Sequence, residues 1–296
     1  MIEIGHRPQR SLARSVAVPG TGFITGSRVT LRFCPAVANT GIVFLRTDLR
    51  KPEPIPARAD RVTGTQRRTT LGSGPNQVTL AEHVLAALAG MRIDNCIVEL
   101  DGPEPPGLDG SCMAFVEAIV DGGIVLQMSM RTRWSVREAV VLKQGGATLS
   151  LFPATGDSLR FSYFLDYGPR SPIAPQTHSE KITSETFPRE IAPCRTFLLE
   201  EEAVQLQRQG IGKHLKPTEL LVFGAHGPID NELRRPNEPA RHKILDLVGD
   251  LALSGMDLAG HVVAYRSGHP LNVELAKTLC RMAERAAIPS PCRIAA

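Results

Sequence analysis

The sequence lacks the long apolar run that a membrane-spanning helix requires, because no stretch approaches ~18 consecutive apolar residues. Residues 1–18 carry charges but no apolar core of the kind found in signal peptides, so we expect no signal peptide. The six cysteines include no C-x-x-C pair, and we expect them to be free, mostly buried thiols in a reducing compartment. These absences predict a cytoplasmic protein without a transmembrane segment.

The sequence also lacks the patterns that mark nucleic-acid and nucleotide binding. Lysine and arginine total 34 against 30 acidic residues, and the basic residues are scattered along the chain, which argues against a nucleic-acid partner. The glycine-rich segments PGTGFITG (19–26) and LGSGPN (71–76) match neither G-x-G-x-x-G nor the phosphate-loop pattern. We therefore interpret both as hairpin turns and expect no doubly wound nucleotide-binding fold.

The length of 296 residues favours two domains over one compact core. The first half is expected to contain strands within 15–36, 40–48 and 94–102, and helices at 79–91 and 111–123. The stretch 127–133 is polar and basic, which suggests a boundary. The predicted domains are residues 1–128 and 129–296.

The second half repeats the plan of the first. It is expected to contain a hairpin at 135–154, a strand at 159–167, helices at 199–210 and 241–251, a strand and loop at 260–272, and a closing helix at 270–287. The segment HVLAALAGMRIDNCIVEL is echoed by HKILDLVGDLALSGMDLAGHVVAY. Two similar units, each with strands first and apolar helices later, predict an α+β protein built by duplication.

The segment RHKILDLVGDL (241–251) carries ionisable residues close to its apolar stripe. A helix places His242, Asp246 and Asp250 on one face, one turn apart. Burying such groups is costly unless a partner satisfies them. The i, i+4 pair of His242 and Asp246 can hold one metal ion from a single helix, although this spacing alone is more often a surface ion pair.

A second helix start, AEHV, places Glu82 directly beside His83. A carboxylate next to a metal-bound histidine is well placed to take a proton from metal-bound water. These two segments would suit a hydrolytic metal site, but taken alone they are weak signals.

Six segments occur in the order and approximate spacing of one known family: VTLRFCPAVANTGIVFLRTDL (29–49), AEHVLAALAGMRIDN (81–95), LDGPEPPGLDGS (100–111), CRTF (194–197), RHKILDLVGDL (241–251) and YRSGHPLN (265–272). The chain resembles the UDP-3-O-acyl-N-acetylglucosamine deacetylases, zinc amidases of lipid A synthesis in Gram-negative bacteria. The likeness runs from Ser15 to Leu275. It implies two similar domains in a layered β-α-α-β sandwich, with the metal site at the domain interface.

The resemblance implies a role for each matching residue in the metal site. His83, His242 and Asp246 match zinc ligands, with Fe²⁺ as an alternative metal in the cell, and a fourth position is left for water. Glu82 matches the general base that takes the proton of that water.

The resemblance also implies the residues that surround the metal. His269 matches the general acid, and Asp250 the carboxylate that orients it. Thr196 matches a hydroxyl that holds the oxyanion, Lys243 a contact to the substrate diphosphate, and Phe197 a contact to the sugar or uridine. The open alternatives are an arginine partner for Asp250, solvent exposure for Lys243, and a helix N-cap for Thr196.

Two segments depart from the family pattern. Ile24, in GFITG, stands where the family carries a histidine. The segment KHLKP (213–217) stands where a Gly-Gly-Ser loop usually shapes the acyl passage, and its bulkier residues His214, Leu215, Lys216 and Pro217 are expected to alter the substrate walls.

These departures leave three interpretations open. The first is a deacetylase of a UDP-linked acylated amino sugar, expected to act as a monomer with transient contact to a membrane surface. The second is a paralogous zinc deacetylase of a different N-acetylated nucleotide sugar or glycan. The third is a non-catalytic sugar-nucleotide binding protein, against which the complete set of Glu82, His269 and the three matched ligands argues.

Overall fold

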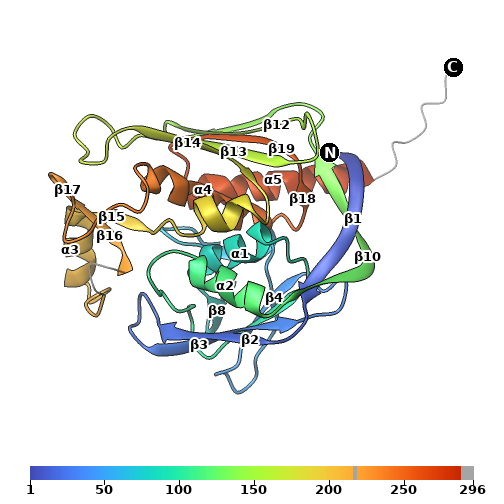
Figure 1. The fold of residues 1–296 in the computed structure, drawn as a ribbon, viewed down its shortest axis with the longest axis horizontal. Coiled ribbons are helices and arrows are strands. Elements are labelled where there is room, and N and C mark those ends of the chain that lie inside the picture. Colours follow the sequence, from blue (N-terminus) through green and yellow to red (C-terminus); the bar gives the residue numbers. More distant parts are fainter. Residues whose placement is uncertain (216–218, 288–296) are drawn as a thin grey trace.

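In the computed structural model, which describes residues 1–215 and 219–287, two five-stranded sheets enclose the main helices (Figure 1). The lower sheet in Figure 1 has the order β2-β3-β9-β4-β5, formed by Val16–Thr21, Arg28–Pro35, Cys96–Leu100, Ile42–Arg46 and Ile55–Pro56. The upper sheet has the order β11-β12-β19-β13-β14, formed by Val140–Gln144, Ala147–Phe152, Gly260–Tyr265, Leu159–Leu165 and Gln176–Ile182. The predicted α+β class is confirmed.

The helices form the two layers between these sheets. They are α1 (Ala81–Gly90), α2 (Met113–Asp121), α4 (Glu238–Ala252) and α5 (His269–Ala287), whereas α3 (Glu200–Arg208) lies at the left edge in Figure 1. Short helical turns occur at Ala59–Arg61 and Phe187–Ile191. The helix predicted at 270–287 begins one residue earlier, so that His269, expected in a loop, is the first residue of α5.

The two sheets share one topology, as expected for a duplicated unit. In each, the third strand of the order pairs antiparallel with the second and parallel with the fourth. In each half, one helix precedes that central strand and another follows it: α1 and α2 flank β9, and α4 and α5 flank β19. Both predicted glycine-rich turns are confirmed as hairpin connections, β2–β3 and β7–β8.

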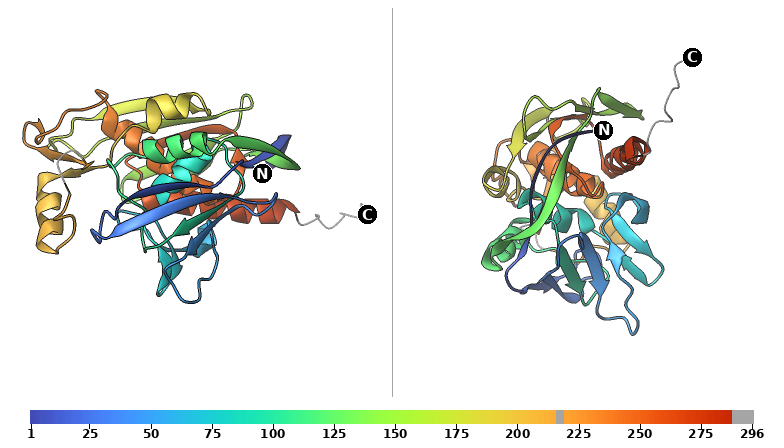
Figure 2. Two further views of the ribbon diagram at one scale, coloured as in Figure 1. Left: turned by 60° about the horizontal axis from the view of Figure 1, so that its bottom comes forward. Right: turned by 90° about the vertical axis from the view of Figure 1, so that its right-hand side faces the viewer.

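Three smaller sheets complete the fold. A long ribbon of β1 (Ile2–Leu12) and β10 (Ile124–Ser135) curves along one side of the molecule, and β18 (Asp257–Leu258) pairs with β10 (Figures 1 and 2). The others are β15-β16-β17 (Phe197–Leu199, Leu221–Gly224, Gly227–Pro228) and β6-β7-β8 (Val62–Gly64, Thr70–Ser73, Asn76–Val78). The predicted boundary at 128/129 lies inside β10, and it stays a prediction.

No helix within residues 1–215 and 219–287 is both long and apolar enough to cross a membrane. Five cysteines in the same ranges are free thiols, and three of them are buried, which agrees with the expected free, mostly buried thiols. Cys292 lies outside the described residues.

Candidate active site

Helices α1 and α4, one from each half of the chain, bring three predicted site residues together. The ligand atoms of His83, His242 and Asp246 all lie within 4.8 Å of one another. Oδ1 of Asp246 is 3.3 Å from Nε2 of His242 and 3.7 Å from Nε2 of His83. Two ring nitrogens and one carboxylate oxygen form a donor set suited to a divalent metal with a position left for water.

The close approach of these helices depends on Gly249 of α4. A Cβ atom at this position would lie 2.1 Å from the carbonyl oxygen of Glu82, so a side chain here would collide with the first turn of α1. Because His83 follows Glu82, Gly249 sets the distance between His83 and the residues of α4.

The orientation of His242 is fixed from behind by the backbone. The carbonyl oxygen of Cys194 accepts a hydrogen bond from Nδ1 of His242 at 3.1 Å, so Nδ1 carries the proton and Nε2 is left as the lone-pair donor. Burial lowers the pKa of His242 to about 4, against the opposing effect of Asp246. His242 is therefore neutral at pH 7, the form that binds a metal.

Asp246 is held as an anion by Lys243. The Lys243 ammonium donates to Oδ2 of Asp246 at 2.8 Å and lies 5.5 Å from the centroid of the Phe197 ring. Burial opposes ionisation of Asp246, but Lys243 and His242 hold its pKa well below the usual range. Phe197 in turn packs edge-on against His242, with ring centroids 6.1 Å apart.

A second buried group lies beside the first and contains Glu82, His269 and Asp250. Nε2 of His269 is 3.9 Å from Oε1 of Glu82, and Nδ1 of His269 donates to Oδ2 of Asp250 at 2.8 Å. Burial raises the pKa of Glu82. Burial works against protonation of His269, but Asp250 outweighs it and raises that pKa to about 9. The arrangement thus holds a proton acceptor facing a protonated imidazole.

Two further residues support this group and were not identified from the sequence. The Thr69 backbone N–H donates to Oε2 of Glu82 at 2.9 Å, and the Thr69 hydroxyl donates to Oδ1 of Asp250 at 2.6 Å. The side-chain amide of Asn272 donates to Oδ2 of Asp250 at 2.9 Å. Asn272 lies three residues after His269, and its place in the quoted GHPLN segment was an available signal. Thr69 follows two arginines in a polar segment, so nothing in the sequence indicated that it belongs to the site.

The CRTF segment reaches the site through its neighbours. Thr196 lies between Cys194 and Phe197, both of which contact His242, and its backbone N–H donates to the Gly110 carbonyl at 2.8 Å. The adjacent Arg195 forms a buried ion pair with Glu238 at the start of α4, with 2.9 Å between Nε and Oε1. This ion pair fixes CRTF to the helix that carries His242 and Asp246.

The two departures from the family pattern contact each other. His214 forms a hydrogen bond of 2.9 Å between Nε2 and the carbonyl oxygen of Gly22, which belongs to the GFITG turn. Glu104 accepts the backbone N–H of Ile24 at 2.9 Å and fixes the same turn. Residues 216–218 lie outside the described residues, so the expectation for Lys216 and Pro217 stays a prediction.

Two histidines and a carboxylate, next to a buried glutamate and a carboxylate-supported histidine, define the class of this protein as a metal-dependent hydrolase. Comparison with known proteins agrees. A family model described as UDP-3-O-acyl N-acetylglycosamine deacetylase matches residues 9–281. The chain belongs to this family, and the predicted class of hydrolases acting on an amide is confirmed.

Similar proteins include two full-length relatives named UDP-3-O-acyl-N-acetylglucosamine deacetylase. The one from Chlamydia abortus is 42% identical over 92% of this chain and 97% of its own length. The one from Trichormus variabilis is 39% identical over 92% of this chain and 98% of its own length. A bifunctional enzyme LpxC/FabZ from Chlorobaculum tepidum is 39% identical over 94% of this chain, and the matched region spans 65% of that longer protein.

Proposed function

We propose that the protein removes the N-acetyl group from UDP-3-O-acyl-N-acetylglucosamine in lipid A biosynthesis. The family match and the names of the full-length relatives support the reaction. The observation that carries it is the 3.9 Å approach of Glu82 and His269 next to the His83, His242 and Asp246 set. Amide hydrolysis needs both a base for the water and an acid for the leaving amine.

The metal we propose is zinc, held by His83, His242 and Asp246. The fit rests on the donors: His242 is neutral with Nε2 free, Asp246 is ionised, and nitrogen donors disfavour calcium and magnesium. Fe²⁺ accepts the same donors and is the alternative. When bound, zinc would lower the pKa of its water to about 7 and polarise the substrate carbonyl.

Glu82 and His269 divide the proton transfers between them. Glu82, with its pKa raised by burial, accepts the proton of the attacking water through Oε1. His269 donates its Nε2 proton to the leaving amine nitrogen. Asp250 holds the opposite ring nitrogen, so Nε2 faces Glu82 and the imidazolium is stabilised.

The remaining residues are proposed to bind the substrate. The Thr196 hydroxyl donates a hydrogen bond to the developing oxyanion. A well-placed donor of this kind stabilises the transition state by roughly 3–4 kcal/mol. Phe197 contacts the sugar or uridine. Lys243 contacts the diphosphate, and its ion pair with Asp246 gives it a second role in keeping that ligand ionised.

One observation favours a second candidate, a paralogous deacetylase of a different N-acetylated nucleotide sugar or glycan. His214 contacts the GFITG turn, so the two segments that depart from the family pattern lie together where both are expected to shape substrate binding. The reaction is the same and the substrate differs. We further propose a cytoplasmic location, supported by the free cysteines, and a monomeric state as predicted.

The decisive experiment combines metal analysis with turnover of the acylated UDP-N-acetylglucosamine precursor. We expect one zinc or iron per chain and release of acetate. Turnover of a non-acylated UDP-sugar in preference to the precursor would favour the second candidate. Retention of metal with no turnover of any N-acetylated sugar would contradict both.

A further inference from the structure

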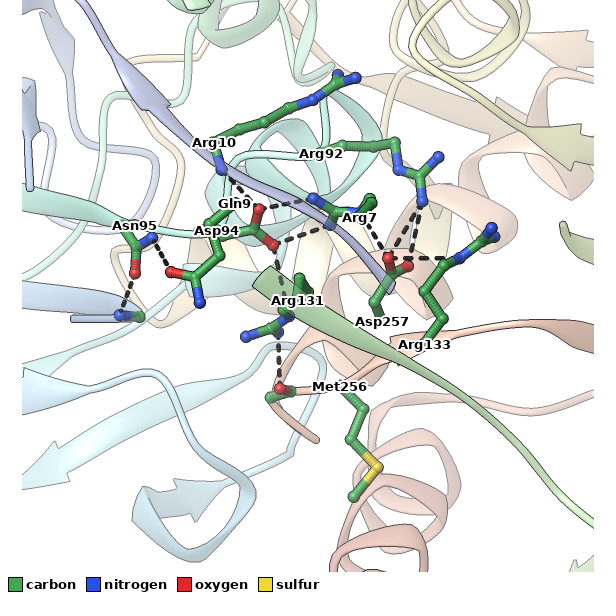
Figure 3. Close-up of polar contacts among 12 residues, drawn as sticks. Arg7, Gln9, Arg10, Arg92, Asp94, Asn95, Arg131, Arg133, Met256 and Asp257 are labelled. Atoms are coloured by element: carbon green, nitrogen blue, oxygen red, sulfur yellow. Dashed lines mark hydrogen bonds and ion pairs between the residues drawn. The ribbon is translucent and has the colours of Figure 1, made fainter. Parts of the chain in front are cut away.

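A cavity of about 490 Å³ lies at the far end of the α1–α4 pair from the candidate metal site. One wall is formed by the C-terminal parts of both helices, including Leu88 of α1 and Leu251 of α4. The β1–β10 ribbon and β18 bring charged side chains to the opposite wall (Figure 3). Nothing in the proposed deacetylation uses this cavity.

Positive charge exceeds negative charge around this cavity. Six cationic and three acidic side chains line it, an excess of three positive charges: Arg7, Arg58, Arg92, Arg131, Arg133 and Lys181 against Asp94, Asp157 and Asp257. Asp157 is 82% exposed and is therefore screened by water. The buried carboxylate of Asp94 and the half-buried one of Asp257 are the main counter-charges.

Arg7 is the main hydrogen-bond donor to these two carboxylates. It donates to Asp94 through Nη1 at 2.7 Å and Nη2 at 2.9 Å, and to Asp257 through Nε at 2.6 Å. Arg92 donates to Asp257 at 3.1 Å (Figure 3). Arg7 thus accounts for the attachment of β1 to the end of α1 and to β18.

Arg131 and Arg133 of β10 are only partly paired: Nη2 of Arg131 donates to the Gly255 carbonyl at 2.7 Å, and Nη1 of Arg133 lies 3.4 Å from the exposed Asp157. Nε of Arg131 is 3.4 Å from Asp94, and Nε of Arg133 is 3.7 Å from Asp257. Both Nε atoms are buried, and neither has a hydrogen-bond acceptor among residues 1–215 and 219–287. A buried donor without an acceptor is unfavourable, so these two groups call for an acceptor that the chain does not supply.

Capping of the helix C-termini explains only part of the arginine cluster, through the contact of Arg131 with the Gly255 carbonyl just after α4. The last carbonyls of α1 accept backbone amides, such as Ile93 N–H to the Leu88 oxygen at 2.8 Å. Those of α4 do the same, such as Gly255 N–H to the Ala252 oxygen at 2.9 Å. The excess positive charge also affects Arg10, which lies on the same strand as Arg7. Burial and the positive charges of Arg7 and Arg92 lower the pKa of Arg10.

We propose that this cavity binds a phosphate group, held by Arg92, Arg131 and Arg133. The guanidinium fork matches the tetrahedral phosphate oxygens and donates paired hydrogen bonds to them. The ligand is inorganic phosphate or the phosphomonoester of a small molecule or lipid headgroup. It bridges β10 to the end of α1, and so joins the ribbon to the helix that carries Glu82 and His83.

The test is calorimetric titration of the metal-loaded, full-length protein at constant ionic strength, with chloride as the reference anion. The probes are inorganic phosphate, glycerol 3-phosphate, and phosphatidylcholine vesicles with and without phosphatidic acid. We expect phosphate-dependent binding that weakens at least tenfold in the Arg131→Gln/Arg133→Gln double variant. The control Arg32→Gln, at an exposed arginine on β3, is expected to bind like the parent.

The Arg131→Lys/Arg133→Lys double variant keeps the positive charges but loses the paired N–H donors of the guanidinium groups. It is expected to bind phosphate several-fold more weakly than the parent. It also decides the question if the glutamine variant fails to fold. Binding of the soluble probes identifies a free phosphate ligand, and binding of phosphatidic acid vesicles alone identifies a lipid headgroup. Absence of binding by every probe, or equal binding by the parent and both double variants, would overturn the proposal. Metal content and deacetylation without phosphate are expected to stay unchanged in all variants.

Discussion

The Thr69 hydroxyl donates a hydrogen bond of 2.6 Å to Asp250, a residue 181 positions further along the chain. Both residues are fully buried, and the Thr69 backbone N–H is bonded to Glu82 at the same time. A single threonine thus joins the proposed base to the carboxylate that supports the proposed acid. The relative position of Glu82 and His269 thus depends on a residue that bonds to Glu82 and Asp250 and lies 3.5 Å from Nδ1 of His269, but is not one of the proposed metal ligands.

We therefore expect Thr69→Val to lower kcat while leaving the metal content unchanged. Valine keeps the shape but leaves one Asp250 oxygen without its donor. The loss costs about 1–3 kcal/mol for a buried group, which corresponds to a roughly 5- to 150-fold lower kcat if it falls on the transition state. Thr69→Ser keeps the hydroxyl and is the matched control, expected to stay near the parent. Equal activity of the valine and serine variants would show that the hydrogen bond has no catalytic consequence.

The pH dependence of activity is expected to report the titration of His269. Asp250 raises the pKa of His269 to about 9 from an ordinary value of 6.5, so the acid form persists at neutral pH and is lost as pH rises through about 9. The stabilisation from this pair is fully present below the ordinary pKa and disappears over the same interval. Activity should fall on the alkaline side accordingly.

Asp250→Asn removes the charge that raises this pKa. The alkaline limb of the kcat/KM profile is therefore expected to move to lower pH relative to the parent measured with the same metal. Nitrogen-15 chemical shifts of His269 provide an independent reading of its titration. An unchanged limb in this variant would assign it to another group.

Glu82→Gln is expected to retain the metal and lose most turnover. The change removes the proton acceptor but none of the three proposed ligands, and loss of a general base typically costs ~10²–10⁴-fold. His83→Ala is the companion variant and should lose metal, because it removes a ligand. Metal content by atomic absorption, measured with kcat on the same samples, separates the two roles. Full turnover by the Glu82 variant would contradict the assignment.

Acyl-chain preference tests the wall formed by His214 and the GFITG turn. Side-chain bulk in place of a glycine loop is expected to shorten or redirect the acyl passage, and each excluded methylene forfeits about 0.8 kcal/mol of burial. The protein should therefore favour shorter acyl chains than a family member with the Gly-Gly-Ser loop, and His214→Gly should shift kcat/KM towards longer chains. A parent preference for long chains as steep as that of the Gly-Gly-Ser relative would show that the passage is open.

Helix positions and the core of the site followed from local sequence patterns. The apolar spacing in residues 79–91 and 241–251 predicted α1 and α4, because such spacing reflects one buried helix face. The i, i+4 pair of His242 and Asp246 followed from the same geometry. The pairing of Asp246 with His83 depended on the family resemblance, since periodicity says nothing about which helices cross.

Contacts between distant segments could not be predicted in this way. Gly249 is needed because the Glu82 backbone lies against it, which is a property of the crossing and not of either helix. The arginines at 7, 92, 131 and 133 are scattered in the sequence, and the scatter indicated ordinary surface charge. The fold gathers them at one cavity, so spacing along the chain was a poor guide to their grouping in space.

The matched topology of the two sheets has a consequence for symmetry. When the repeats are aligned through HVLAALAG and HKILDLVG, His83 and His242 occupy equivalent positions, as do Gly90 and Gly249. The two histidines are therefore counterparts in the two repeats, and their ring centroids lie 5.1 Å apart. Ala87 stands in the first repeat where Asp246 stands in the second. Each repeat thus supplies one histidine at the equivalent position, but only the second repeat supplies the carboxylate, so the proposed metal site needs both halves of the chain in unequal parts.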